Sequence, residues 1–212
     1  MKIEIWADVA CPWCYVGKRR FERALAQFGG RDDVEVVWRS YELDPRAPRT
    51  QALSGPEVLA RKYRVSVAQA NAMNERLKAE GLKDGLDLHP ERIRMVNTFD
   101  AHRLVHHAGS LGKRAEMVER LFRAYHTEGE TLSDADTLLK LGTEVGLDVA
   151  STRAVIDGDA FSREVRDDEE RAGSFGISGV PFFAVDEKYG ISGAQPPEHI
   201  LAALTQAMND DA

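Results

Sequence analysis

The only two cysteines of the chain, Cys11 and Cys14, lie two residues apart in the stretch DVACPWCYVG, residues 8–17. If a helix begins at this stretch, its free amide groups and its dipole favour a thiolate at the first sulfur. A thiolate is the nucleophile of thiol–disulfide exchange. The second sulfur, one helical turn further on, is close enough to attack the resulting mixed disulfide and release the partner. The pair therefore predicts disulfide chemistry.

The residues around the sulfurs fit this interpretation. Pro12 suits the first turn of a helix, where its missing N–H costs nothing. Trp13 is expected to project beside the sulfurs and to shape the surface that a substrate meets. Asp8, three residues before Cys11, is either a carboxylate that tunes the thiol or carries protons, or an ordinary loop residue.

Other uses of the two cysteines are open but less well supported. A zinc site would need His102 and His106, which are spaced i, i+4 on one predicted helix, yet the chain has no second CxxC and the spacing differs from a short zinc knuckle. A structural disulfide would close too small a loop to add much stability. The intervening Pro-Trp argues against two merely buried thiols. We therefore expect neither a metal ion nor an organic cofactor.

The first 40 residues have the pattern of a βαβ unit. Residues 2–7 alternate as in a strand, and residues 12–28 carry apolar side chains at helical spacing and end at Gly29-Gly30. Residues 34–38, VEVVW, form the next predicted strand. Such a unit requires a crossover connection and parallel pairing of its strands.

The middle of the chain is expected to contain only helices. Turn-forming residues at 44–55 mark a boundary, and Ser66 to Gln69 has the form of a capping box. Ser133 is the expected N-cap of a later helix. The predicted helices span residues 67–81, 90–108 (beginning at Pro90), 112–126, 133–145 and 159–173.

The C-terminal part returns to strands. Residues 180–185 and 190–193 are the predicted strands, and Pro196 or Pro197 opens a last helix. If the two ends of the chain form one sheet, the helical block is an insertion. We therefore predict an α/β fold whose main domain comprises residues 1–55 and 159–212, with an inserted all-helical domain at 56–158.

A second candidate for the site is the segment Ser178-Gly179-Val180-Pro181-Phe182. A proline that opens a strand after a β-branched residue occurs at a sheet edge or in a cis turn. Alone it would be read as an ordinary start of a strand, but it gains weight beside an N-terminal CxxC.

Composition limits the possible partners and location. The formal net charge of −7 and the pI of about 5.4 argue against nucleic acid or an anionic membrane. No apolar run reaches the roughly 18 residues of a membrane span. The N-terminus MKIEIWADVA lacks the pattern of a secretory signal, so we expect a cytoplasmic protein, where a close cysteine pair is more often catalytic or metal-binding than structural.

Together these motifs resemble the DsbA family of thioredoxin-fold oxidoreductases, in its FrnE-like branch, related to 2-hydroxychromene-2-carboxylate isomerases and kappa-class glutathione transferases. The resemblance rests on WADVACPWCYVGKRRFE, VVWRSYELDP, NTFDAHRL, MVERLFRAYHTEG, SGVPFF and ISGAQPPE. It implies a thioredoxin fold interrupted by a helical domain, with the active site at their junction. It further implies that Cys11 attacks and Cys14 resolves, that Pro181 is a cis-proline, and that the backbone of Val180 pairs with a bound peptide. Asn97, on a helix facing the site, would contact a substrate thiol.

Two departures limit what carries over. The chain has no second cysteine pair near its C-terminus, and Pro-Trp replaces the Pro-His of strongly oxidising relatives. We expect a cytoplasmic thiol–disulfide oxidoreductase that acts on a thiol or disulfide in a protein or small molecule. A low-molecular-weight thiol or a reductase would supply electrons, and a homodimer is a candidate assembly. The alternatives are a thiol-dependent isomerase or transferase for a small hydrophobic molecule, and a peptide-binding module whose cysteines sense redox state.

Overall fold

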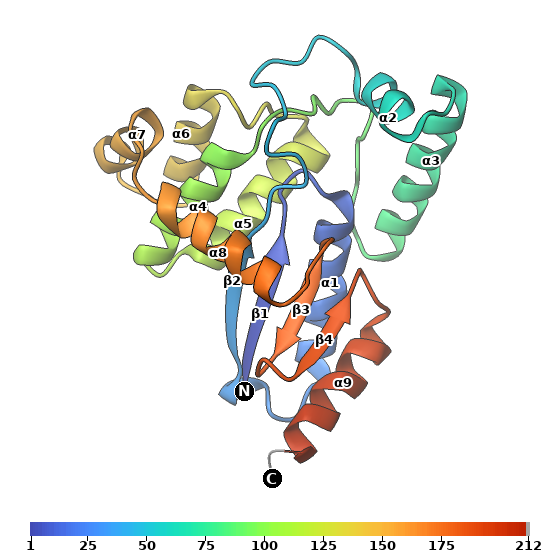
Figure 1. The fold of residues 1–212 in the computed structure, drawn as a ribbon, viewed down its shortest axis with the longest axis vertical. Helices are drawn as coiled ribbons and strands as arrows, with labels where there is room; N and C mark the ends of the chain where they lie inside the picture. The colour runs from blue at the N-terminus through green and yellow to red at the C-terminus, as the bar shows by residue number, and fades with distance from the viewer. Residues whose placement is uncertain (211–212) are drawn as a thin grey trace. The chain divides into compact units, whose positions relative to one another are not determined.

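The computed structural model describes residues 1–210 (Figure 1). The chain divides into two compact units, one formed by Met1–Leu43 together with the segment from Arg166 onward, the other by Asp44–Val165.

The first unit is built on a four-stranded mixed sheet with the order β2-β1-β3-β4. Strand β1 is parallel to β2 and antiparallel to β3, and β3 is antiparallel to β4. Ile5 of β1 lies between Trp38 of β2 and Phe183 of β3. Because β1 and β3 come from opposite ends of the chain, the helical block is inserted into this fold, as the sequence predicts. The strands are β1 (Lys2–Ala7), β2 (Glu35–Ser40), β3 (Phe182–Val185) and β4 (Tyr189–Ser192).

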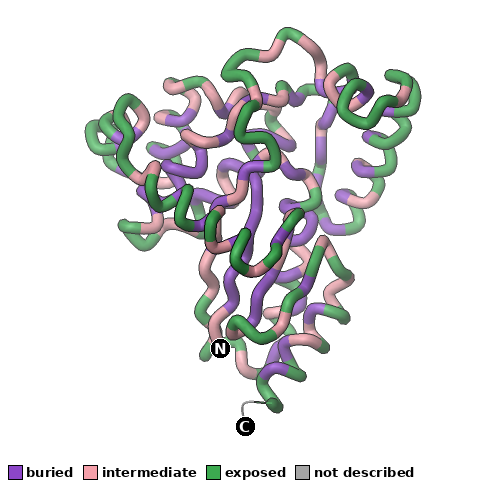
Figure 2. The backbone as a smooth tube through the Cα atoms, viewed as in Figure 1, coloured by how far each residue is buried: buried purple, intermediate pink, exposed green. Residues whose placement is uncertain are grey.

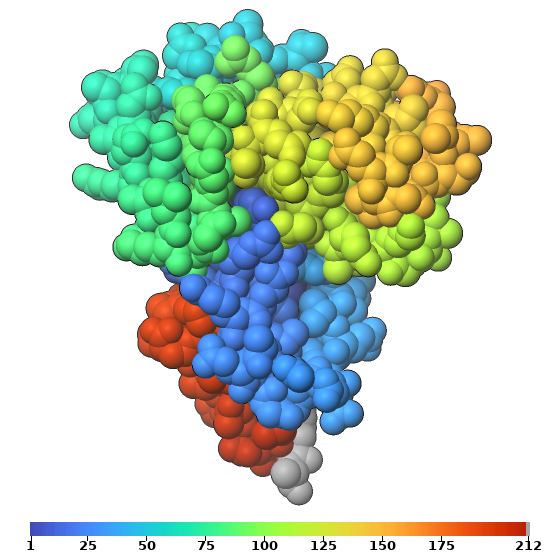
Figure 3. All heavy atoms as spheres, turned by 180° about the vertical axis from the view of Figure 1, so that it is seen from behind, coloured from blue at the N-terminus to red at the C-terminus, as the bar shows by residue number. Residues whose placement is uncertain are grey.

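Helices cover both faces of the sheet. Ile5 and Phe183 face the helix that follows β1, and the ring of Phe183 stacks on Phe21 at 5.6 Å. Figure 2 shows that β1 is buried along almost its whole length. Figure 3 shows the first and last helices packed side by side on the rear face. The helices of this unit are α1 (Pro12–Gln27), a 3-10 turn (Arg31–Asp33), most of α8 (Ser162–Ser174) and α9 (Pro197–Asp210).

The opposite face of the sheet packs on α8 through Trp6. The indole is fully buried, and its Nε1 donates a hydrogen bond to the carbonyl of Asp168 at 2.9 Å. Phe175 meets the ring edge-on at 5.6 Å, and Ala172 belongs to the same apolar cluster. Trp6 therefore fastens α8 to the central strand.

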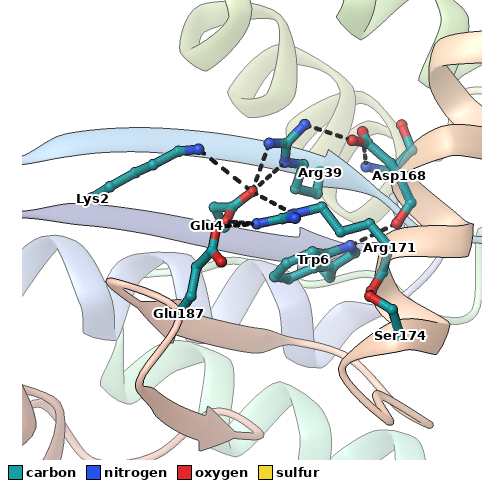
Figure 4. Close-up of polar contacts among 9 residues, drawn as sticks. Lys2, Glu4, Trp6, Arg39, Asp168, Arg171, Ser174 and Glu187 are labelled. Carbon is teal, nitrogen blue, oxygen red and sulfur yellow. Dashed lines mark hydrogen bonds and ion pairs between the residues drawn. The ribbon is translucent and has the colours of Figure 1, made fainter.

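A charged network on the same face extends this attachment (Figure 4). Glu4 is 1% exposed and accepts hydrogen bonds from Arg39 of β2 at 2.6 Å and from Arg171 of α8 at 2.7 Å. Arg39 also donates to Asp168 at 2.8 Å. Burial by itself raises the pKa of Glu4, but the bonds from the two guanidinium groups outweigh it and hold the pKa below its usual value.

The second unit contains helices only, as the sequence predicts. The predicted capping box is present, because Ser66 accepts from the amide of Gln69 at 3.1 Å and Gln69 accepts from the amide of Ser66 at 2.9 Å. Its elements are α2 (Gly55–Tyr63), α3 (Val67–Lys83), α4 (Phe99–Ser110), α5 (Arg114–Arg123), a π-helical turn (Ala124–Glu128), α6 (Ala135–Glu144) and α7 (Val149–Asp157).

The prediction that a helix begins at Pro90 is wrong. Residues 90–98 are not helical, and α4 begins at Phe99. Ile93 and Val96 are buried although they lie outside any helix, so their spacing reflects contacts of an irregular segment with its surroundings. The N-cap of α4 is Thr98, and the side-chain oxygen of Asn97 before it accepts from the amide of Phe99 at 3.0 Å.

Ser133 is not the N-cap of α6. The cap is Asp134, whose carboxylate accepts from the amide of Thr137 at 2.8 Å. The hydroxyl of Ser133 instead donates to the carbonyl of Arg49. Serine and aspartate are equally good N-caps, so the sequence alone does not choose between Ser133 and Asp134. The bond of Ser133 to Arg49 leaves Asp134 as the cap.

Within residues 1–210, no helix has both the length and the apolar character needed to cross a bilayer.

Candidate active site

The cysteine pair lies at the junction of β1 and α1. Cys11 is the N-cap of α1, and Pro12 occupies the first turn, as expected. The amide of Cys11 donates to the carbonyl of Asp8 at 3.0 Å, and the amide of Cys14 donates to the carbonyl of Cys11 at 3.0 Å. A tight turn and the first helical turn together hold the two sulfurs on one side of the helix start.

The residues of the CPWC motif differ in exposure. Both cysteines are free thiols; Cys11 is 5% exposed and Cys14 is 1% exposed. Trp13 between them is 42% exposed. An external group can therefore reach the first sulfur more readily than the second, and it would meet the indole of Trp13 beside it.

The environment of Cys14 keeps its thiol protonated. Burial raises the pKa of Cys14 well above its usual value, and its interaction with Cys11 raises it further. The negative charge of Asp8 acts in the same direction. Cys14 is therefore a thiol at neutral pH, which suits a residue that reacts only after a disulfide has formed beside it.

The structure brings the Val180–Pro181 segment to the sulfurs. The thiol of Cys11 contacts the carbonyl oxygen of Val180 at 3.6 Å, across 169 positions of sequence. The Val180–Pro181 peptide bond is cis, and Pro181 is buried directly before β3. The two motifs that the sequence analysis singled out thus form one site in the first unit.

Asp8 holds the loop before Cys11. It is 1% exposed, and its two carboxylate oxygens accept from the amide of Ala10 at 3.0 Å and from the amide of Leu43 at 2.7 Å. This is the arrangement of an Asx turn with an additional long-range bond. Asp8 is therefore a buried anchor of the loop and a source of charge near Cys14, rather than an exposed loop residue.

Asn97 belongs to the second unit and does not lie on a helix, contrary to the expectation. Its side-chain nitrogen donates to the carbonyl of Pro45 at 3.3 Å, while its oxygen accepts from the amide of Phe99, the first residue of α4. These bonds give Asn97 a structural role in its own unit. A contact with a substrate thiol stays a prediction.

The histidines of the zinc alternative, His102 and His106, are both buried in α4. Within the part of the chain that the structure describes, no three His, Cys, Asp or Glu side chains are grouped so as to hold a metal ion.

Motif analysis missed one residue close to the sulfurs. Gly17 is buried in the interior of α1, one turn after Cys14. Glycine is about 1 kcal/mol less favourable than alanine in a helix interior. An unfavourable glycine inside a predicted helix is therefore the sequence signal that could have identified Gly17.

The comparison with protein families agrees with this geometry. Residues 2–205 match the DSBA-like thioredoxin domain. The chain belongs to this DsbA-like thioredoxin family. The thioredoxin fold with a helical insertion and the family resemblance stated from the motifs are thereby confirmed.

Known proteins show how far the similarity extends. An uncharacterised protein of Bacillus subtilis, YwbO, is 30% identical over 187 residues, which cover 87% of this chain and 86% of the relative. The crystal structure of a probable DsbA oxidoreductase from Streptomyces coelicolor is 43% identical, covers 99% of this chain and 90% of that one, and superposes with a TM-score of 0.95. The cytosolic disulfide reductase DsbM from Pseudomonas aeruginosa, solved with glutathione, is 19% identical, covers 99% and 100% of the two chains and has a TM-score of 0.67; this likeness shows the fold alone.

Proposed function

We propose that this protein is a thiol–disulfide oxidoreductase that works through Cys11 and Cys14. The observation that carries the proposal is the pairing of a more accessible sulfur with a buried thiol one turn behind it, next to the backbone of Val180. Family membership supports the same reaction class.

The reaction would proceed in two exchanges. The Cys11 thiolate attacks one sulfur of a substrate disulfide, which forms a mixed disulfide and releases the other substrate sulfur as a thiolate. Cys14 then loses its proton and attacks the Cys11 sulfur, which forms the Cys11–Cys14 disulfide and releases the remaining substrate thiolate. Two electrons pass from the dithiol to the substrate. The reverse sequence would oxidise a substrate dithiol.

Substrate binding would use the segment beside the sulfurs. An extended peptide next to Cys11 would pair with the backbone of Val180, in the manner of a strand added to a sheet. The buried ring of Pro181 would shape this groove and keep metal ions away from the sulfurs. Trp13 would provide an apolar surface for the substrate.

The reaction needs neither a metal ion nor an organic cofactor, but it needs a source of electrons. A low-molecular-weight thiol is the simplest reductant, because two of its molecules regenerate the dithiol and leave as a disulfide. The structure of the DsbM fold relative contains glutathione, which makes a glutathione-like thiol the first candidate. We propose the cytoplasm, where such thiols are abundant, as the location, and a FrnE-like specificity for protein or small-molecule disulfides.

The test is to replace Cys14 by serine. The Cys14→Ser variant is expected to accumulate mixed disulfides through Cys11 with a disulfide-bonded substrate, because the second exchange is blocked. Intact-mass measurement under non-reducing conditions detects the adduct. The Cys11→Ser control, which keeps the buried thiol alone, should form no adduct.

The same variant separates the alternatives. A thiol-dependent isomerase or transferase would need one thiol only, so Cys14→Ser would retain turnover and trap nothing. A peptide-binding module would bind unfolded peptide even after both cysteines are replaced. Retained turnover without a trapped adduct would contradict the proposed oxidoreductase. Retained peptide binding would contradict it only if Cys14→Ser also traps no mixed disulfide.

A further inference from the structure

At Gly17, next to the site, the absence of a side chain lets Pro181 pack directly on the backbone of α1. A Cβ atom built on this residue would lie 2.8 Å from Cγ and 3.4 Å from Cβ of Pro181, and 3.6 Å from Cβ of Ala194. Real Cβ atoms essentially never approach another atom within 3.0 Å. Because the proline ring is closed and cannot rotate away, an alanine here would force Pro181 and α1 apart.

A second residue of α1 holds the other side of the same segment. Arg20, one turn after Gly17, donates to the carbonyl of Ala194 at 2.7 Å. The amide of Gly193, next to Ala194, donates to the carbonyl of Pro181 at 2.8 Å. The turn after β4 is thus bonded both to the proline and to the helix.

We propose that Gly17 and Arg20 are positioning residues for the reaction. Gly17 lets Pro181 pack directly on α1, and Arg20 holds the Gly193–Ala194 turn that backs the proline. Since Cys11 begins the same rigid helix, the closeness of this packing sets the position of Val180 relative to the Cys11 sulfur. The inference rests on the proposed function, in which a substrate strand pairs at Val180.

The test compares two disulfide substrates in the Gly17→Ala variant. A peptide disulfide needs the pairing with Val180, whereas 5,5′-dithiobis(2-nitrobenzoate) needs only the sulfur. The ratio of kcat/KM for the peptide to that for the small disulfide should fall about tenfold, mainly through KM, which corresponds to about 1.4 kcal/mol of lost pairing. A general loss of folded protein would lower both values equally and leave the ratio unchanged.

Gly173→Ala is the matched control. Gly173 is also helical, in α8, and a Cβ there would meet no atom within 4 Å. The Gly173→Ala variant should have the same ratio of peptide to small-disulfide kcat/KM as the wild type. Arg20→Gln removes the bond to the Gly193–Ala194 turn without inserting an atom into the packing. It should also lower the ratio of the two kcat/KM values, even if Gly17→Ala does not fold. A ratio within about twofold of the wild type in every folded Gly17 or Arg20 variant would overturn the inference.

A second measurement is independent of turnover. In a Cys14→Ser background, displacement of Val180 should uncover Cys11 and raise its rate of alkylation by N-ethylmaleimide in Gly17→Ala relative to Gly173→Ala. If the wild type reduces neither disulfide, the proposed function fails, and the alkylation rate alone decides whether Gly17 positions the segment; equal rates would reject it.

Discussion

At the residue scale, both cysteines are buried, but their contacts differ although only two residues separate them. Cys11 ends a loop and contacts Val180, whereas Cys14 points into the core, where burial and Cys11 raise its pKa. The two side chains lie three positions apart, so they share one face of the helix start at different depths. This arrangement supports the proposed order, in which Cys11 attacks and Cys14 resolves.

The raised pKa of Cys14 predicts a pH dependence of stability in the reduced protein. The unfolded chain releases the Cys14 proton near the ordinary cysteine pKa of about 8.5, while the folded chain still holds it. The folded state therefore binds more protons above that pH, and its free energy of unfolding falls as pH rises, by at most about 1.4 kcal/mol per pH unit. Below pH of about 8 this contribution is fully present.

Urea unfolding of reduced protein between pH 7 and 10 measures this effect. The Cys14→Ser variant is the control, since it retains every other titrating group. The wild type should lose stability more steeply than the variant above pH of about 8.5. Parallel curves would show that Cys14 is not held as a thiol.

At the element scale, the sheet and α8 are joined by an apolar contact and a charged one. Trp6 supplies the first and Glu4 the second, and both alternate with Ile3 and Ile5 on β1. The alternation predicted a strand, but a glutamate at a buried position was not expected. Its partners Arg39 and Arg171 come from β2 and from a helix more than 160 residues away.

Removal of the Glu4 charge should destabilise the protein. Glu4→Gln removes the carboxylate that Arg39 and Arg171 share. Because both guanidinium groups are partly exposed and each keeps a second carboxylate, Asp168 for Arg39 and Glu187 for Arg171, we expect a loss of about 1.5 kcal/mol, the low end for a hydrogen bond to a charged group. Since the pKa of folded Glu4 is lowered, its stabilisation is present above the unfolded pKa of about 4.3 and disappears as pH falls through the folded value.

Chemical denaturation at pH 7 and pH 3 checks both parts. The stability difference between wild type and Glu4→Gln should be large at pH 7 and should shrink at pH 3. Glu35→Gln, at an exposed position of β2, should change little at either pH. An equal effect of the two substitutions at pH 7 would exclude a stabilising role for the network.

At the scale of the whole molecule, the two units differ in how many segments of the chain form them. The second unit is a single segment, whereas the first needs both ends of the chain to complete its sheet. Residues 41–54 connect β2 to α2, and Glu42 is the only buried residue among them. By contrast, the irregular segment 90–98 is anchored by buried Ile93 and Val96.

This difference predicts where a protease cuts first. Local unfolding of residues 43–54 exposes no buried side chain and breaks only hydrogen bonds and an ion pair, so trypsin should cleave after Arg46 or Arg49 before any other site. Mass spectrometry of early digestion products identifies the cut. In an Arg46→Gln/Arg49→Gln variant the first cleavage should be slower; first cleavage after Arg92 or Arg94 would contradict the assignment.

A redox titration reports on the active site in the intact protein. In thiol/disulfide buffers the fluorescence of exposed Trp13 should follow a single two-electron transition, with a slope of about 30 mV per tenfold change. Trp6, which is buried against α8, is the internal reference, and Trp13→Phe should abolish the change. Absence of any transition, with both thiols still open to alkylation after oxidant, would refute a redox-active pair.

The sequence by itself determined the local elements and the reactive pair. Residues 2–7 and 12–28 follow the periods of a strand and a helix, and the CxxC spacing places both sulfurs on one turn of the helix that begins there. The strand-opening Pro181 was also recognisable. These features depend on neighbours within a few residues.

Tertiary structure decided everything that depends on distant partners. Ile93 and Val96 have helical spacing but lie in an irregular segment, because α4 begins only at Phe99, after Asn97 has bonded to Pro45. The 3.6 Å contact between Cys11 and Val180 joins positions 169 residues apart. Neighbouring residues do not explain a glycine in the middle of α1, whereas the packing of Pro181 against Gly17 does. Sequence periodicity records which side chains are buried, and only the folded chain shows what each one is buried against.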